Sequence, residues 1–144
     1  MASVATEILH DVAERLRTSG LFAEVAVGSP AAASAVPRAS VAYDGHDVFL
    51  SDDRANVLWV RLRARVVMHS RAARDDGRLA LAADLASAVT NVLMADPWRG
   101  ERCRDLPVGR ATEVGRAEVA SGGRGSEVEI ALAVRCHYEI EEGT

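Results

Sequence analysis

Hydrophobic and polar residues alternate with a period of two along two long segments of the chain, residues 57–68 and 126–140. This alternation predicts β-strands in a sheet that has one dry side and one solvent-facing side. Typical strands run about 5–6 residues, whereas each of these segments can span about 40 Å at roughly 3.3 Å per residue. Such strands exceed the needs of a small globular domain and suit a subunit whose sheet reaches a neighbouring molecule.

Two other segments have the periodicity of amphipathic helices. Ser3 and Gly20 stand where an N-cap and a C′ glycine bound the first, residues 3–19, whose apolar positions are Val4, Ala5, Ile8, Leu9, Val12 and Leu16. Pro97 follows the second, residues 77–94, whose apolar stripe consists of Leu81, Ala82, Leu85, Ala88, Val89, Val92 and Leu93.

Shorter strands are predicted between these elements, at residues 21–27, 39–43, 48–50, near 101–106 and across 108–120. Asp44-Gly45 is a turn signal between two of them. Residues 28–37 are rich in Ala and Ser and predict a flexible loop, and the Gly-rich tract 121–125 predicts a hairpin tip. The element order predicts one α+β domain over residues 1–144. Its mostly antiparallel sheet has two helices packed on one face and includes a long β-hairpin.

Length and composition set the class of protein. A chain of 144 residues is expected to form one domain whose core needs no metal or disulfide. Apolar residues make up 49% and aromatic residues only 4%, so Ala, Val and Leu must fill the core. All 17 basic residues are Arg, against 21 acidic residues, for a net charge of −4. An acidic chain without a basic tail is a poor candidate for nucleic-acid binding.

The cysteines and the apolar runs bear on the compartment. Cys103 and Cys136 are too few for a disulfide framework, and no CxxC pair indicates zinc. Acidic residues interrupt the first apolar segment, and no apolar run reaches about 18 residues. We therefore expect a soluble protein, made in a reducing cytoplasm, with no membrane partner.

No group of residues predicts catalysis. The phosphate-binding loop, the dinucleotide GxGxxG pattern and the GxSxG nucleophile elbow are all absent from the sequence. His69 and His137 share a strand face with arginines and would be neighbours if their strands pair in that register, which leaves a weak metal hypothesis beside ordinary surface polarity. Asp44-Gly45-His46-Asp47 fits a turn better than a metal or catalytic loop. We expect no catalytic residue, no metal and no cofactor.

The polar faces of the two long strands are the best functional lead. Arg61, Arg63 and Arg65 project from one face of residues 57–68, and Glu127 and Glu129 lie on the matching face of the last strand. One interpretation is a cross-strand Arg–Glu ladder, each pair contributing about 0.2–1 kcal/mol. The other is contact with a neighbouring subunit or a polyanion, and the net negative charge favours a protein.

Two further features extend this candidate interface. Trp59 shares the parity of the arginines, so it lies outside the core unless a helix covers that face. The hairpin tip adds Gly122, Gly123 and Arg124. The full candidate interface consists of Trp59, Arg61, Arg63, Arg65, Glu127, Glu129, Gly122, Gly123 and Arg124.

The order of these segments resembles that of the tail terminator and tail-completion proteins of long-tailed bacteriophages and related particles. An N-terminal helix containing Ile8-Leu9-His10-Asp11-Val12 leads directly to the strand Leu21-Phe22-Ala23-Glu24-Val25. A Pro-bearing loop then precedes Ala39-Ser40-Val41, and a central helix ends in Asp96-Pro97. The last strand contains Val134-Arg135-Cys136-His137-Tyr138, and the likeness covers nearly the whole chain.

The resemblance implies a structural virion protein of the tail or neck, assembled in the bacterial cytoplasm. Members form a hexameric ring on the last ring of the tail tube, stop tube growth and present a surface to the head–tail connector. The implied partners are therefore other copies of the chain, the tail-tube protein and the connector. Two alternatives stay open: another neck or tail subunit, such as a connector stopper or tube-related protein, and a small ligand-binding or enzymatic α+β domain.

Overall fold

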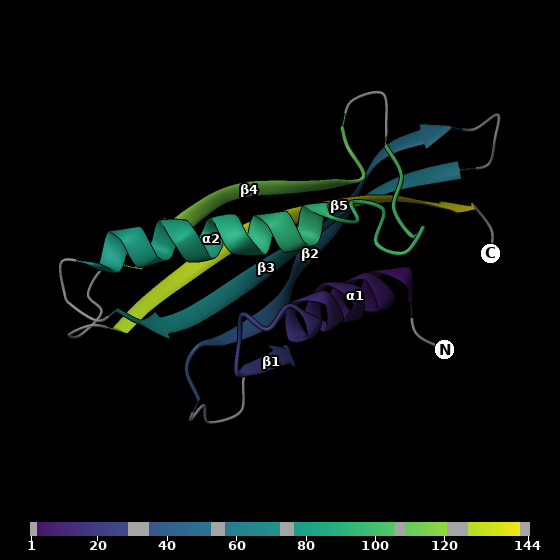
Figure 1. Cartoon of the computed structure of the whole chain (residues 1–144). Coiled ribbons are helices and arrows are strands. Elements are labelled where there is room, and N and C mark those ends of the chain that lie inside the picture. The colour runs from purple at the N-terminus through teal and green to yellow at the C-terminus, as the bar shows by residue number, and fades with distance from the viewer. Residues whose placement is uncertain are drawn as a thin grey trace.

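The computed structural model describes residues 3–28, 35–52, 57–72, 77–105, 109–120 and 127–141, with the backbone alone at 49–52 and 141. The predicted loop over 28–37 and the hairpin tip over 121–125 lie largely or wholly outside these residues. Seven elements follow one another along the described chain (Figure 1): α1 (Val4–Thr18), β1 (Glu24–Val27), β2 (Arg38–Asp52), β3 (Val57–Arg71), α2 (Arg78–Met94), β4 (Thr112–Val119) and β5 (Glu127–Glu141).

The strands form one sheet in the order β1-β2-β3-β5-β4. Among the described strands, the β1–β2 pair is parallel and the β2–β3, β3–β5 and β4–β5 pairs are antiparallel. Both helices lie on the same face of the sheet, α1 over β1 and β2, and α2 over β4 and β5 (Figure 1). This arrangement confirms the predicted α+β class, with its mostly antiparallel sheet and its two helices on one face.

Residues at both ends of α1 place this helix where the sequence predicts it. The Ser3 side chain accepts a hydrogen bond from the Thr6 backbone N–H at 3.1 Å, as an N-cap does. The helix ends at Thr18, and Gly20 follows with a φ of +78°, a conformation that glycine adopts without steric cost. Five apolar residues on one side of the helix are buried: Ile8, Leu9, Val12, Ala13 and Leu16.

The core fills the space between the helices and one face of the central strands. Every second residue of β3 and β5 is buried there, and these residues are Val60, Leu62, Ala64, Val66, Met68, Val128, Ile130, Leu132, Val134, Cys136 and Tyr138. Burying each aliphatic side chain stabilises the fold by roughly 1.5–3 kcal/mol relative to exposing it. The period-two pattern of the sequence therefore assigned the buried face of both long strands correctly.

Three strands are 15 residues long: β2, β3 and β5. The two long strands that the sequence predicts are confirmed, while β2 is longer than expected. Asp44-Gly45 is not a turn, because β2 continues through it, and residues 48–50 belong to the same strand. The pairing with β3 shifts between Tyr43 and His46, where Gly45 has a φ of +97°. A type I′ hairpin turn needs positive φ at both central residues. Here Gly45 alone has it, which produces a β-bulge instead.

The predicted strand near 101–106 is wrong over its described part, residues 101–105. Arg99, Gly100 and Glu101 have consecutive positive φ values of 49°, 64° and 70°. This left-handed stretch coils the chain after α2 and prevents an extended entry into a strand. A backbone hydrogen bond from Arg104 N–H to the His137 carbonyl, at 3.0 Å, attaches the coil to β5. The coil thereby occupies the edge of β5 beyond the end of β4.

Candidate interaction surface

The side of the sheet that faces away from both helices is polar, and we call it the bare face. On β3 it carries Arg61, Arg63 and Arg65, which alternate with the buried core residues. On β5 it carries Arg135, and Arg63, Arg65 and Arg135 are all exposed. Neither described helix packs on this side (Figure 1). The prediction that the three β3 arginines share one face outside the core is therefore confirmed.

The predicted Arg–Glu ladder is wrong, because the strand register separates the two sets of charges. The Cα partners of Arg61, Arg63 and Arg65 on β5 are His137, Arg135 and Ala133. Glu129 lies opposite His69 instead, and their side chains approach to 3.0 Å between Oε1 and Nε2. Glu127 lies opposite Arg71 and forms a 3.8 Å ion pair with Arg38 of β2. His69 and His137 are eight positions apart along their strands and are not neighbours.

Like charges consequently face one another at the centre of the sheet. Arg63 lies directly opposite Arg135, a placement that destabilises an antiparallel pair. Each has one carboxylate partner on the neighbouring strand: Asp47 of β2 lies 2.8 Å from Arg63, and Glu113 of β4 lies 3.8 Å from Arg135. Within the described part of the chain, Arg65 has no ion-pair partner. We call Arg61, Arg63, Arg65 and Arg135 the arginine patch.

A shallow groove adjoins the arginine patch, and we call it the alanine groove. It consists of two adjoining hollows of about 370 and 310 Å³ that share Arg65, Glu118 and Ala131 in their linings. The floor is low because β5 presents the small residues Ala131 and Ala133 there. Glu129 of β5 also lines the first hollow. Arg65 of β3 forms one wall, and Arg116 and Glu118 of β4 form the other. The bare face therefore has a hollow with fixed charges along both sides.

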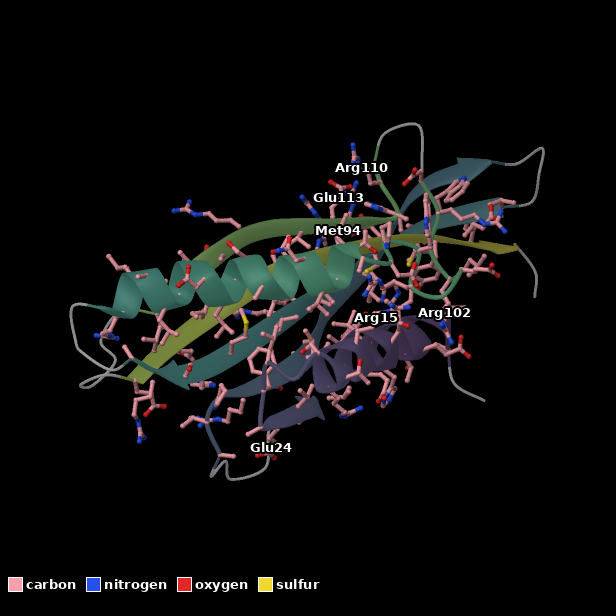
Figure 2. The ribbon with its side chains drawn as sticks, viewed as in Figure 1. Arg15, Glu24, Met94, Arg102, Arg110 and Glu113 are labelled. Carbon is pink, nitrogen blue, oxygen red and sulfur yellow. The ribbon has the colours of Figure 1, made fainter. Side chains whose placement is uncertain are left out.

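His137 is a buried histidine at one end of the arginine patch. Its Nε2 lies 3.1 Å from Arg61 Nε, which can only donate, so Nε2 accepts this hydrogen bond. Its Nδ1 then carries the proton and donates to the Arg110 carbonyl at 2.6 Å. The side chain of His137 is fully buried between the sheet and residues 109–111. These contacts give His137 a structural role in holding Arg61 in place. Figure 2 shows Arg110 and Glu113 near this end of β4.

The remaining members of the predicted interface lie in different places. Trp59 is half-exposed on the bare face, between Leu50 of β2 and Glu139 of β5. Gly122, Gly123 and Arg124 lie outside the described residues. Glu127 and Glu129 share the bare face with the arginine patch but lie toward the opposite end of the sheet. The structure thus places Trp59 and the three β3 arginines along one face of β3. Glu127 lies opposite Arg71, at the end of that strand, whereas Glu129 lines the same hollow as Arg65.

A second surface, which the sequence did not indicate, lies on the helix side at the far end of the long strands. Val48 of β2 is 52% exposed there, and Ile140 of β5 is 38% exposed. Tyr43 of β2, opposite Ala64 near the middle of β3, is 52% exposed on the same side. Val48 and Val60 are Cα partners, and Val60 pairs in turn with Tyr138. Figure 1 shows these strand ends running past the C-terminal end of α2. We call Tyr43, Val48 and Ile140 the apolar end patch.

A network of charged side chains joins α1 to the coil after α2. Arg15 forms ion pairs with Asp11 in α1 and with Asp96 beyond α2. Arg99 is fully buried, its Nη1 lies 3.5 Å from Asp11 Oδ2, and its Nη2 donates to the carbonyls of Leu93 and Asp96. Figure 2 shows Arg15 in the space between the two helices. Sequence reasoning missed this network, because its four members share no motif.

Burial and neighbouring dipoles alter the pKa values of this network. Burial lowers the pKa of the Arg99 guanidinium, and the nearby carboxylate of Asp11 opposes that effect. Burial also acts to raise the pKa of Asp96. The backbone N–H groups of Gly100 and Trp98 and the charges of Arg15 and Arg99 outweigh it, so the pKa of Asp96 lies below its ordinary value. Asp96 is thus held as a carboxylate that receives hydrogen bonds from the coil, at 3.0 and 3.1 Å.

The two cysteines lie in the core. Cys103 of the coil and Cys136 of β5 are both free thiols and are 2% and 0% exposed. A hydrogen bond between the two side chains, together with burial, raises the pKa of Cys103. A buried thiol with a raised pKa stays protonated and unreactive. Cys136 is likewise a small residue packed in the hydrophobic core.

Over the described ranges, no cluster of three or more His, Cys, Asp or Glu side chains is placed to hold a metal ion. Neither α1 nor α2, the two helices of the described chain, is long and apolar enough to cross a membrane.

Comparison with known proteins identifies a similar fold. The chain is similar to a chain in a structure described as the virion of a native gene transfer agent (GTA) particle. The TM-score is 0.59 and the identity 18%, over 97% of this chain and 100% of that chain. The type 4 fimbrial biogenesis protein PilO from Pseudomonas aeruginosa aligns less well. Its TM-score is 0.39 and its identity 8%, over 92% of this chain and 68% of that chain. No family model and no curated protein sequence matches. The first likeness shows a shared fold over the whole length of both chains.

Proposed function

We propose that this chain is a structural subunit of a phage-like particle. Its role there is that of a tail terminator: copies assemble into a hexameric ring that caps the tail tube and meets the head–tail connector. The shared fold with a chain of a gene transfer agent virion supports a virion protein. The likeness of the element order to tail terminators supports the finer role. On this proposal the particle's tail or neck is where the protein resides.

The observation that carries the proposal is the length and exposure of the long strands. Three strands of 15 residues run side by side, and each spans about 50 Å at roughly 3.3 Å per residue. A helix of 17 residues, the length of α2, spans only about 25 Å. The strands therefore extend past the helix and leave the apolar end patch open. A subunit in a ring covers such a surface with its neighbour.

Ring formation requires that different patches on adjacent copies meet. Such a head-to-tail contact produces a ring when the rotations from each copy to the next add up to one full turn. The apolar end patch and the bare face are two different surfaces of one sheet. Trp59, Arg61, Arg63 and Arg65 of the bare face are the candidate residues for the second contact. Gly122, Gly123 and Arg124 of the predicted hairpin tip, with Glu127 and Glu129, complete the proposed interface. This pair of surfaces meets the requirement for a heterologous contact.

Light scattering coupled to size-exclusion chromatography tests the proposal directly. The purified chain should form a species of about six times the mass of one chain, alone or after addition of preassembled tail-tube protein. A tube preparation incubated with the protein should also stop elongating. A protein that stays monomeric at high concentration, neither binds the tube nor limits its length, and behaves so on repeated preparations would refute the proposed role.

A further inference from the structure

The register shifts between the described strands are confined to the pairings of β2 and β4. The central pair, β3 and β5, keeps one register along the whole length of both strands. β2 shifts twice against β3, over residues 43–46 and 48–50, and β4 shifts once against β5, over residues 114–117. Strand length alone does not produce these shifts, because β3 and β5 are as long as β2.

The part of β2 that contains the shifts is also the part that β1 leaves uncovered. β1 pairs with residues 38–41 of β2, and the Gly28 N–H donates to the Val41 carbonyl at 2.8 Å. Past Val41, β3 lies along one edge of β2, and no described strand lies along the other. β4 likewise has β5 on one side and no described strand on the other. The peptide groups of such free edges can pair with a strand of another chain.

Each shift is a β-bulge that places one extra residue on the outer strand. Residues 43 and 46 of β2 are three steps apart, whereas their partners on β3, Ala64 and Leu62, are two steps apart. The second bulge of β2 and the bulge of β4 have the same excess of one residue. Gly45 lies in the first bulge with a φ of +97°, and a Cβ atom there would meet no described atom within 4 Å. Glycine therefore supplies backbone conformation at this position rather than space.

The free edge of β2 also has exposed apolar side chains. Tyr43 and Val48, which border its two bulges, are each 52% exposed. A long free edge with exposed apolar residues is a site at which chains aggregate. A bulge bends its strand and interrupts the regular spacing of N–H and C=O groups that an added strand needs. The bulges therefore lie where unwanted pairing with another chain is easiest.

We propose that the bulges of β2 and β4 keep the free sheet edges of separate copies from pairing with one another. Contacts between copies are then left to the faces and the ends of the sheet. The inference goes beyond the proposed function, because it concerns the contacts that the fold prevents in any assembly that the chain joins.

Deletion of Gly45 tests the inference, because it removes the extra residue and leaves Tyr43, His46 and Val48 on their present face of the sheet. In sedimentation velocity, the deletion variant should associate at about ten-fold lower protein concentration than the unaltered chain. Amide hydrogen exchange should slow along residues 42–48, where an added strand would bond. Gly45→Asn is the matched control, because Asn adopts positive φ more readily than most residues. It should keep the bulge and associate as the unaltered chain does.

Deletion of Gly115 is the second variant, since it removes the extra residue of β4 in the same way, and circular dichroism checks the folding of both. Folded deletion variants that associate like the unaltered chain would show that the bulges only bend the sheet, and would overturn the inference. Equal association of Gly45→Asn and the Gly45 deletion would overturn it too, as would failure of both deletion variants to fold.

The outcome is separate from that of the proposed function. A chain that never forms a ring, but whose deletion variants associate through their edges, would refute the proposed function alone. A ring-forming chain whose folded deletion variants associate no more strongly would refute this inference alone.

Discussion

At the scale of single residues, the side chain of Arg99 connects α1 with the C-terminal end of α2, and no sequence motif indicates this connection. Its guanidinium donates to two carbonyls at the C-terminal end of α2 and lies beside Asp11 of α1. A cation at a helix C-terminus is favoured by the helix dipole, and here it also satisfies carbonyls that lack partners within the helix. Its Nε makes no hydrogen bond within the described chain. Arg99 is therefore held by charge as much as by hydrogen bonds.

Replacing Arg99 with Ala should destabilise the fold strongly. The change leaves Asp11 short of a counter-charge and uncaps α2, and removing one partner of a buried pair costs about 3–5 kcal/mol. Equilibrium unfolding in urea measures the loss. Arg17→Ala is the control, because Arg17 forms an exposed pair with Glu14, and such pairs contribute about 0–1 kcal/mol. Equal losses in the two variants would show that the network around Arg99 does not stabilise the fold.

Asp96 should make stability depend on pH in the acid range. Its pKa in the folded chain lies below the ordinary value of 3.8. The stability that it contributes is therefore fully present above that value and is lost as the pH falls through the folded pKa. In urea titrations from about pH 6 to about pH 3, the free energy of unfolding should fall less in Asp96→Asn than in the unaltered chain. Parallel curves for the two proteins would contradict this assignment.

At the scale of elements, α2 is only partly buried in spite of its apolar composition. Its fully buried side chains, Val89 and Leu93, lie in its C-terminal half, whereas Leu79 in its first turn is 74% exposed. Such an apolar helix is usually buried on most sides. The predicted stripe is correct for Ala82, Val89 and Leu93, which are buried, while Leu81, Leu85 and Val92 are partly buried and pack against the core. One face of α2 packs on the sheet, and the rest of its apolar surface remains open.

Substitutions on α2 should therefore have very unequal effects. Leu93→Ala leaves a cavity in the core and should cost about 2–5 kcal/mol. Leu79→Ala removes the same atoms from an exposed site and should change stability by less than about 0.5 kcal/mol. Thermal unfolding followed by circular dichroism measures both. If Leu79→Ala were as destabilising as Leu93→Ala, the first turn of α2 would have to be packed against something else in solution.

The elements also show what sequence alone can and cannot predict. A period of two fixes which residues of β3 share a face, so the side occupied by Arg61, Arg63 and Arg65 was predictable. The same period does not determine the register between strands. The placement of these arginines opposite His137, Arg135 and Ala133 was therefore not predictable. The sequence predicts a turn at Gly45, where the chain forms a β-bulge. Asp-Gly occurs in both structures, and only the backbone conformation distinguishes them. The network of Arg99 depends on contacts between distant segments and leaves no periodic signal.

At the scale of the whole molecule, the sheet has two unlike surfaces that lie outside the core. The bare face is charged and contains the arginine patch and the alanine groove. The apolar end patch lies on the opposite side, where Tyr43 and Val48 are each 52% exposed. Exposed apolar groups that gather at one place mark sites of protein association more often than scattered ones do. The two surfaces fit a subunit that contacts neighbours on both sides of its sheet.

A charge in the apolar end patch should weaken self-association and leave folding intact. In the double variant Val48→Glu/Ile140→Glu, association would have to bury two carboxylates, and each unpaired buried charge costs several kcal/mol. Sedimentation velocity should therefore show that the protein concentration needed for association rises by about ten-fold or more. Leu79→Glu is the matched control, because it charges an exposed apolar site on α2 instead. If Leu79→Glu dissociates the assembly and the double variant does not, the open face of α2 is the contact between copies, and the long strands extend for another reason.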